Sequence, residues 1–384
     1  MRLIVVLLFS LSCFLSAQTN KSKYPTLEIG AKAPDFSLKG VDGKMHTLAE
    51  YKAKCLAIVF NCNHCPTAQA YEDRIIKIVE DYKDKDFQLI MISSADPQAV
   101  RLNEMGFTVV DDSYEAMIIR AKNKKYNFPY LYDGETQKCS MAYGPTVTPH
   151  LFIFDGERKL QYHGRIDNDE LGKEITKNDG RNAIDAVLAG KKVEVPITRA
   201  KGCSTKWAYK RDAVKEYNEA WLKKEVTLAE IDAAGLKKLI KNDSEKVRII
   251  NIWATTCGAC VAEMPDLVKI NRQFETRGVE LITVSADNVS LKKRALKVLE
   301  SVNCAVTDRI AKTLAKEGRA TNNFIAAIKD QDEFFDAVDP KWNGSLPYTM
   351  VIAPGGKLIY SINDEIDVVE LKTKLVEYLG NTYK

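Results

Sequence analysis

A run of apolar residues followed by a helical pattern occurs twice in the chain. Residues 55–60 (CLAIVF) are all apolar, which is typical of a central strand covered on both faces. From Pro66 onward apolar residues recur at helical spacing, and proline is well tolerated in the first turn of a helix. The same order returns at 247–253 (VRIINIW), followed by a helical pattern through Phe274. The sequence therefore predicts two α/β units, each with a buried strand that leads into a helix.

Both units continue in the same way. The pattern predicts further strands, late hairpins and closing helices, in the first unit at 87–92, 148–163 and 184–188 and in the second at 279–284, 346–360 and 368–378. A short hairpin is expected around Asp42-Gly43, and residues 303–343 read as an insertion of mixed character.

We place the two domains at 24–207 and 227–384. The linker is expected at 208–226, because the chain there is rich in lysine and has few periodic apolar positions. A length of 384 residues agrees with two domains of ordinary size.

Residues 1–17 have the pattern of a secretory signal peptide. Arg2 precedes an apolar stretch at 3–15, and Ser16-Ala17 offers a small-residue cleavage site. The stretch is too short to span a bilayer, and no other long apolar run follows. We expect export to the periplasm or cell envelope of a bacterium, with no transmembrane span after cleavage. Retention as an anchor, or lipidation at Cys13, are the alternatives.

Composition excludes some classes of function. Apolar residues make up 45% and charged residues 28%, as in ordinary soluble globular proteins. Lys plus Arg exceed Asp plus Glu only by 56 to 52, and the basic residues are spread along the chain. Nothing in this charge balance supports nucleic-acid binding.

Two Cys-x-x-Cys motifs carry the candidate chemistry. Each follows a predicted strand and opens a predicted helix: Cys62 with Cys65, and Cys257 with Cys260. A helix N-terminus lowers the pKa of a nearby thiol and so favours the thiolate, which is the species that attacks a disulfide. The sequence therefore predicts Cys62 and Cys257 as attacking cysteines and Cys65 and Cys260 as their resolving partners.

Other roles for the two motifs fit less well. A structural zinc site would need two such pairs about 15 to 20 residues apart, whereas these lie in separate domains. Covalent haem would need a histidine directly after the second cysteine, where Pro66 and Val261 stand. We expect neither a metal nor an organic cofactor.

His64 lies between the first two cysteines. Its imidazole is predicted to donate to the Cys62 thiolate and thereby to raise the reduction potential of the pair, the alternative being a solvent-facing side chain without that effect. Gly258-Ala259 supplies no charge at the second pair, so the two potentials should differ. The other three histidines, His46, His150 and His163, are expected to be structural.

A proline precedes the late hairpin strand of each unit. In Thr148-Pro149 and Leu346-Pro347, a cis peptide bond would expose backbone groups that can pair with an extended substrate beside the cysteines. The alternative is an ordinary proline at the start of a strand.

The second unit resembles the TlpA/ResA type of periplasmic thioredoxin-like reductases over about 228–379. The resemblance rests on residues 253–265 (WATTCGACVAEMP) and on the LPYT sequence that begins at Leu346. Two departures bear on the redox potential: Thr256 stands where the family often has a bulky residue, and Gly-Ala stands where Pro-Pro is common.

The first unit resembles the redoxins related to peroxiredoxins, the AhpC/TSA family, over about 24–207. The resemblance rests on APDF at 33–36, FNCNHCP at 60–66, YEDR at 71–74, Thr148-Pro149 and GCSTKW at 202–207. Peroxidatic centres in that family typically have Thr or Ser three positions before the reactive cysteine and Pro seven before, where this chain has Val59 and Cys55. That departure favours disulfide exchange over peroxide reduction.

Together the two resemblances imply tandem thioredoxin-like folds, each a central mixed sheet flanked by helices, and an exported thiol-disulfide oxidoreductase. Its expected partners are protein thiols and disulfides or a membrane-linked electron donor. Two alternatives remain: a hydroperoxide reductase served by its C-terminal domain, and a non-catalytic binding module with structural disulfides. The roles of Cys55, Cys139, Cys203 and Cys304 stay open between buried thiols, a further disulfide and a relay.

Overall fold

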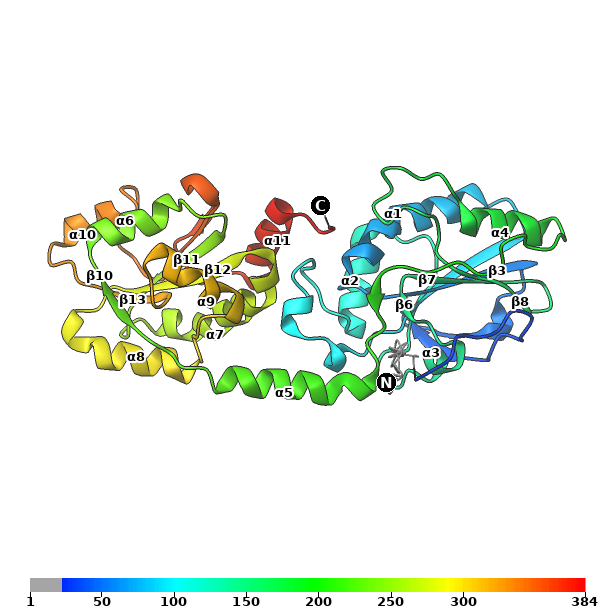
Figure 1. The fold of residues 1–384 in the computed structure, drawn as a ribbon, viewed down its shortest axis with the longest axis horizontal. Helices are drawn as coiled ribbons and strands as arrows, with labels where there is room; N and C mark the ends of the chain where they lie inside the picture. The colour runs from blue at the N-terminus through cyan, green and yellow to red at the C-terminus, as the bar shows by residue number, and fades with distance from the viewer. Residues whose placement is uncertain (1–22, 384) are drawn as a thin grey trace, which may run out of the picture.

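A computed structural model describes residues 23–383 (Figure 1). The predicted signal peptide at 1–17 lies outside the described residues. Within 23–383, no helix combines the length and the apolar character that crossing a membrane requires. The chain forms two lobes that lie side by side, with the N-terminal lobe in blue to green and the C-terminal lobe in green to red (Figure 1).

The described residues of the first lobe form a seven-stranded mixed sheet. Its central strands run parallel, and the outer pairs on both sides are antiparallel. In spatial order the strands are β2 (Met45–Thr47), β1 (Ser37–Gly40), β5 (Tyr130–Tyr132), β4 (Phe87–Ser93), β3 (Cys55–Asn61), β7 (His150–Phe154) and β8 (Leu160–Gly164). The helices are α1 (Pro66–Asp81), α2 (Tyr114–Lys124), α3 (Lys138–Tyr143) and α4 (Asp179–Leu188).

Strand β3 shows why its sequence is apolar throughout. Its residues alternate between two core clusters: Ala57 and Val59 pack in the cluster that includes α1 and α4, and Ile58 and Phe60 pack in the cluster on the other side, which includes α3. Because both faces of the sheet are covered, no position of the strand meets solvent.

The described residues of the second lobe form a six-stranded sheet of the same kind. Its strands in spatial order are β10 (Ala229–Ile231), β13 (Asn323–Ala326), β12 (Val279–Ser285), β11 (Val247–Trp253), β14 (Tyr348–Ile352) and β15 (Leu358–Ile362). The pairs β11–β14 and β14–β15 are antiparallel, and the other neighbouring pairs are parallel. The helices are α6 (Ala233–Lys241), α7 (Gly258–Phe274), α8 (Lys292–Ser301), α9 (Asp308–Leu314), α10 (Gln331–Val338) and α11 (Val368–Leu379).

The prediction of two tandem thioredoxin-like folds with mixed sheets is confirmed. The expected insertion at 303–343 is partly wrong, because it contains β13, which pairs with β12 on one side and β10 on the other. Strands of three or four residues, such as β13 and β10, are too short to show a clear hydrophobic period.

The predicted linker at 208–226 is mostly helical, since α5 (Arg211–Leu222) spans from one lobe to the other (Figure 1). Its buried Trp221 lies under the guanidinium of Arg272 on α7, 4.8 Å from the ring centroid. Near its start, Arg211 pairs with the buried Asp96 of the first lobe. The few apolar positions of this segment therefore suffice for a helix that packs at both ends.

The lobes also touch directly, through a loop of the first lobe and the C-terminal end of α7. Gln273 donates to the carbonyls of Met105 and Thr108 at 2.9 and 2.8 Å. Arg277, which follows α7, donates to the Gly106 carbonyl at 2.8 Å and lies over the Phe107 ring. These contacts fix one end of α7 against the first lobe.

Candidate active site: two cysteine pairs

The first cysteine pair lies between β3 and α1. Cys65, and not Cys62, is the N-cap of the helix, and its sulfur accepts the backbone N–H of Ala68 at 3.4 Å. A residue before proline is disfavoured in the helical conformation, so Pro66 holds Cys65 extended (φ −75°, ψ 120°) and the helix begins after it. The prediction that Cys62 lies at the helix N-terminus is therefore wrong.

Thr148 lies against both sulfurs. The Cys62 Sγ is 3.0 Å from the Thr148 Oγ1, and the Cys65 Sγ is 3.3 Å from the Thr148 carbonyl oxygen. The Thr148–Pro149 peptide bond is cis, as expected. Both cysteines are free thiols in the structure and almost fully enclosed, with 1% of Cys62 and 0% of Cys65 exposed.

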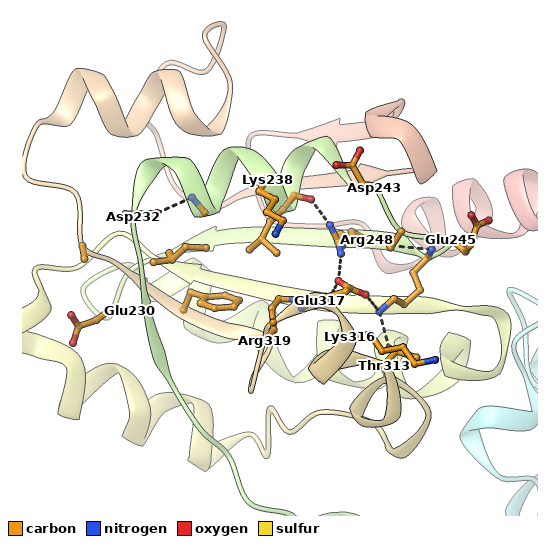
Figure 2. Close-up of a pocket in the computed structure, with 18 residues that line it drawn as sticks. Glu230, Asp232, Lys238, Asp243, Glu245, Arg248, Thr313, Lys316, Glu317 and Arg319 are labelled. Carbon is orange, nitrogen blue, oxygen red and sulfur yellow. Dashed lines mark hydrogen bonds and ion pairs between the residues drawn. The ribbon is translucent and has the colours of Figure 1, made fainter.

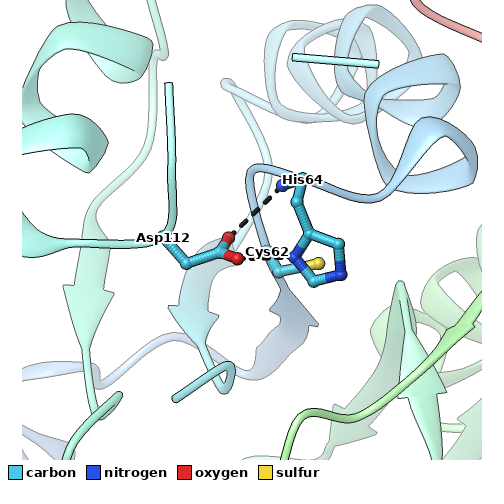
Figure 3. Close-up of side chains that lie close together, drawn as sticks. All are labelled: Cys62, His64 and Asp112. Atoms are coloured by element: carbon cyan, nitrogen blue, oxygen red, sulfur yellow. Dashed lines mark hydrogen bonds and ion pairs between the residues drawn. The ribbon is translucent and has the colours of Figure 1, made fainter. Parts of the chain in front are cut away.

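Asp112 binds the segment between the two cysteines (Figure 3). One carboxylate oxygen lies 2.5 Å from the Nδ1 of His64, and the other accepts the backbone N–H groups of Asn63 and His64 at 2.6 and 3.3 Å. The Nε2 of His64 is buried and has no hydrogen-bond partner among the described residues. The predicted hydrogen bond from His64 to Cys62 is therefore not formed, and the imidazole acts on the pair through its charge.

The surroundings shift the pKa values of the two thiols in opposite directions. Burial raises the pKa of Cys62 well above its usual value. Burial opposes ionisation of Cys65 too, but hydrogen bonds from the Cys203 and Cys62 thiols, the His64 charge and the Ala68 N–H outweigh it and hold the pKa of Cys65 well below its usual value. Burial likewise opposes the charged form of His64, and the Asp112 carboxylate overcomes this, so the pKa of His64 is raised. The favoured thiolate is Cys65.

A third cysteine completes the cluster. The short strand β9 (Cys203–Ser204) pairs antiparallel with β6 (Val147–Thr148), with Thr148 opposite Cys203. The Cys203 N–H donates to the Cys65 Sγ at 3.4 Å. Unlike Cys62 and Cys65, Cys203 is partly exposed.

Cys62, His64 and Asp112 are also the group of metal-type donor atoms that the described residues bring within 4.8 Å of one another. The cysteine spacing, which gave no indication of a metal, does not reveal Asp112 as a neighbour of Cys62. Both oxygens of that carboxylate already accept hydrogen bonds from protein groups, which suits an ion pair with His64. Nothing in the local sequence joins Asp112 to Cys62, so only the fold identifies it.

The second pair is joined, with a Cys257–Cys260 disulfide and 5.3 Å between the two Cα atoms. Cys257 is the N-cap of α7 and its sulfur accepts the Cys260 N–H at 3.2 Å, as the sequence predicted. Cys257 is partly exposed, whereas Cys260 is buried. The Leu346–Pro347 bond is cis, and Leu346 packs against the same core cluster as Cys257.

A pocket of about 1090 Å³ lies in the second lobe (Figure 2). Charged side chains that line it pair with one another: Glu317 with Arg248, Arg319 and Lys246. None of the predicted site residues lines this pocket, so the cysteine chemistry does not use it.

Comparison with known proteins gives a family model for each lobe. The model described as the AhpC/TSA family matches residues 29–163, and the model described as Redoxin matches residues 223–375. Both matched segments include a cysteine pair. These matches agree with the two resemblances seen in the sequence.

Individual relatives match parts of the chain. A thiol-disulfide oxidoreductase ResA of Oceanobacillus iheyensis is 40% identical over 43 residues, which are 11% of this chain and 22% of the relative. A protein of the same name from Geobacillus thermodenitrificans is 24% identical over 136 residues, 35% of this chain and 67% of the relative. The crystal structure of a hypothetical protein from Sinorhizobium meliloti 1021 is 34% identical, covers 48% of this chain and 97% of that chain, and has a TM-score of 0.43.

Proposed function

This chain belongs to the thioredoxin superfamily, with an AhpC/TSA-type domain followed by a redoxin domain, and from that premise we propose that it is a thiol-disulfide oxidoreductase with one redox-active cysteine pair in each domain. The observation that carries the proposal is the same in both lobes. A cysteine sulfur caps the helix that follows a buried strand and accepts a backbone N–H from the first helical turn. Such a sulfur is stabilised as a thiolate and as a leaving group.

In the second lobe the exchange follows from the exposure of the two cysteines. With the pair reduced, the partly exposed Cys257 thiolate attacks a partner's disulfide, forms a mixed disulfide and releases one partner thiolate. Cys260 then attacks the Cys257 sulfur, closes the Cys257–Cys260 bond and releases the second partner thiolate. Two electrons pass to the partner, whose two thiolates take the proton of Cys260 and the proton that Cys257 released to solvent when it ionised. The reverse sequence oxidises a dithiol partner.

In the first lobe Cys62 and Cys65 form the redox pair, and Cys65 carries the negative charge. The His64–Asp112 ion pair and the Ala68 N–H favour the reduced state by stabilising that thiolate, which makes the pair comparatively oxidising. Gly258-Ala259 brings no charge to the second pair, and this supports two different potentials. Leu346, before the cis proline Pro347, is proposed to present backbone groups to an extended partner. At the predicted counterpart Thr148-Pro149 the chain's own strand β9 already pairs with Thr148, so we do not propose that role there.

The proposed partners are protein thiols and disulfides, or a membrane-linked electron donor, in the bacterial cell envelope. The signal-peptide pattern at 1–17 supports export, and disulfide chemistry persists in compartments outside the cytosol. No metal or organic cofactor takes part in the exchange.

Mixed-disulfide trapping tests the proposal. Cys65→Ser and Cys260→Ser each remove one cysteine of a pair, so an adduct with a partner cannot be resolved by closing that pair. Such adducts should accumulate and disappear on reduction. Cys139→Ser and Cys304→Ser, which alter buried thiols outside the pairs, are the controls and should accumulate none. If neither paired variant traps any thiol partner, the proposal is wrong.

Peroxide reduction is the competing activity, and the surroundings of Cys62 disfavour it. A peroxidatic cysteine must be a thiolate, whereas burial raises the pKa of Cys62. Consumption of hydrogen peroxide by the reduced protein, lost in Cys62→Ser, would decide for the peroxidase.

A further inference from the structure

The first cysteine pair is enclosed to a degree that prevents direct exchange with a protein partner. Disulfide exchange needs sulfur-to-sulfur contact along the bond that breaks. Cys62 and Cys65 are 1% and 0% exposed, and Thr148 lies over both sulfurs. A partner's sulfur cannot approach either one in this conformation.

Cys203 lies where the partner's sulfur can approach. It is partly exposed, and its neighbours Lys201 and Ser204 are exposed. Its backbone N–H donates to the Cys65 sulfur, and its side chain packs against the cluster that contains Cys62 and Cys65. The three cysteines thus form one cluster, of which Cys203 is the part nearest the surface.

The backbone is built to bring Cys203 this close. Gly202 has a φ of +151°, and a Cβ at this position would stand 2.0 Å from the Thr148 carbonyl oxygen. Only glycine lets β9 pair with β6 at that approach. The pairing places the Cys203 N–H on the Cys65 sulfur.

We propose that Cys203 is a third redox cysteine, which exchanges with protein partners on behalf of the buried Cys62–Cys65 pair. The inference rests on the proposed function and adds to it the residue that meets the partner.

The steps balance without any further reagent. Cys203 passes its proton to the Cys65 thiolate and attacks the partner's disulfide, forming a mixed disulfide and releasing one partner thiolate, which takes that proton. Cys65 then attacks the Cys203 sulfur, forms a Cys65–Cys203 bond and releases the second partner thiolate. Cys62 attacks the Cys65 sulfur, closes the Cys62–Cys65 bond and frees Cys203, and the proton of Cys62 goes to the released partner thiolate. The pair loses two electrons, the partner gains them, and Cys203 is regenerated.

The full chain with Cys257→Ser and Cys260→Ser isolates the first centre for the test, with insulin as the disulfide-bonded protein substrate. Adding Cys203→Ser should lower the rate of insulin reduction by at least roughly tenfold, because the accessible sulfur is lost. Cys139→Ser, at another buried thiol of the same lobe, should leave the rate unchanged. An unchanged rate in the Cys203→Ser variant overturns the relay.

The same assay separates the relay from the proposed function. If Cys203→Ser reduces insulin at the parent rate while Cys62→Ser does not, the relay is wrong and the exchange activity stands. If Cys62→Ser and Cys65→Ser also keep the parent rate, the proposed function of this centre fails as well.

Two covalent readouts do not depend on rates. In the Cys62→Ser variant, equilibration with oxidised glutathione should give a Cys65–Cys203 disulfide in peptide mapping under non-reducing conditions. In the Cys65→Ser variant, the trapped insulin adduct should lie on Cys203. Finding the adduct on Cys62, or no Cys65–Cys203 bond, contradicts the proposal.

Discussion

The charge that supports a thiolate in the first lobe comes from a residue distant in sequence. Asp112 follows neither cysteine, yet it pairs with His64 and holds the backbone N–H groups of Asn63 and His64. It raises the pKa of the His64 imidazole although the site is buried, and the protonated imidazole favours the Cys65 thiolate. One carboxylate therefore both shapes the turn and sets its electrostatics.

Replacing Asp112 should move the titration of Cys65. In Asp112→Asn, no carboxylate offsets the effect of burial on His64, so the pKa of His64 falls and the imidazole loses its proton more readily. The pKa of Cys65 then rises, and the thiolate fraction at pH 7 falls severalfold. The thiolate absorbance near 240 nm, followed against pH in the Cys257→Ser, Cys260→Ser background, should show its midpoint at higher pH.

Asp111→Asn is the matched control. The Asp111 side chain is exposed and binds the N–H and hydroxyl of Ser113. Its contact with the cysteine segment is through the backbone carbonyl, which accepts the Asn63 amide and is kept in the variant. Its variant should keep the parent midpoint. Equal midpoints in both variants would mean that Asp112 does not set the charge of the site.

At this scale the sequence identified the four paired cysteines and His64, because their spacing is local. It could not identify Asp112, which reaches His64 across 48 residues through the packing of separate elements. The sequence left the role of Cys203 undecided, because its contact with Cys65 depends on the β6–β9 pairing, which the sequence does not show.

At the scale of elements, the two helices begin at different positions of the Cys-x-x-Cys motif. In the second lobe the first cysteine, Cys257, caps the helix, whereas in the first lobe the second cysteine, Cys65, does so. Pro66 follows Cys65 and Val261 follows Cys260, and this single difference accounts for the shift. Pro66 is visible in the sequence, but the shared Cys-x-x-Cys spacing predicts the same helix start in both domains.

The strand pair β6–β9 should be sensitive to a single methyl group. In Gly202→Ala, the new Cβ would meet the Thr148 carbonyl, so β9 must move away and Cys203 with it. We expect the Cys65–Cys203 disulfide of the Cys62→Ser variant to form in lower yield, as measured by peptide mapping after oxidation. Gly190→Ala, at a positive-φ glycine with open space around it, is the control for backbone strain alone. Equal yields in the two variants would show that the close approach is not required.

At the scale of the whole molecule, the two centres lie far apart. The contacts between lobes hold the C-terminal end of α7, and Cys257 lies at its N-terminal end. A helix of 17 residues is about 25 Å long, so Cys257 lies about that far from the contact that Gln273 makes with the first lobe. The first centre is nearer the interface, since Gln69 of α1 donates to the Phe107 carbonyl.

Electron transfer between the two centres should therefore be bimolecular. Starting from protein with one pair reduced and the other oxidised, the rate of equilibration should rise in proportion to protein concentration, as followed by acid quenching, alkylation and mass spectrometry. Gln273→Ala with Arg277→Ala loosens the interface and should add a concentration-independent component. Lys292→Ala, which removes an exposed ion pair of the second lobe, should not. A concentration-independent rate in the parent protein would contradict the arrangement.

The two-lobe organisation and the order of the main strands and helices were predictable, because long apolar runs and helical periods repeat in both halves. The bridging helix α5 was missed although Val214, Tyr217 and Trp221 recur at helical spacing. Of the helix only Trp221 is buried, and the lysine-rich composition around it favoured a linker.

The central claim is that both cysteine pairs cycle between dithiol and disulfide. The most direct test is a redox-buffer titration of the full chain, with alkylation and peptide mass spectrometry reporting the state of Cys62–Cys65 and Cys257–Cys260 separately. We predict two distinct potentials, both above about −300 mV, with the Cys62–Cys65 pair the more oxidising. Potentials far below about −300 mV at both pairs would identify them as permanent structural disulfides and contradict the account.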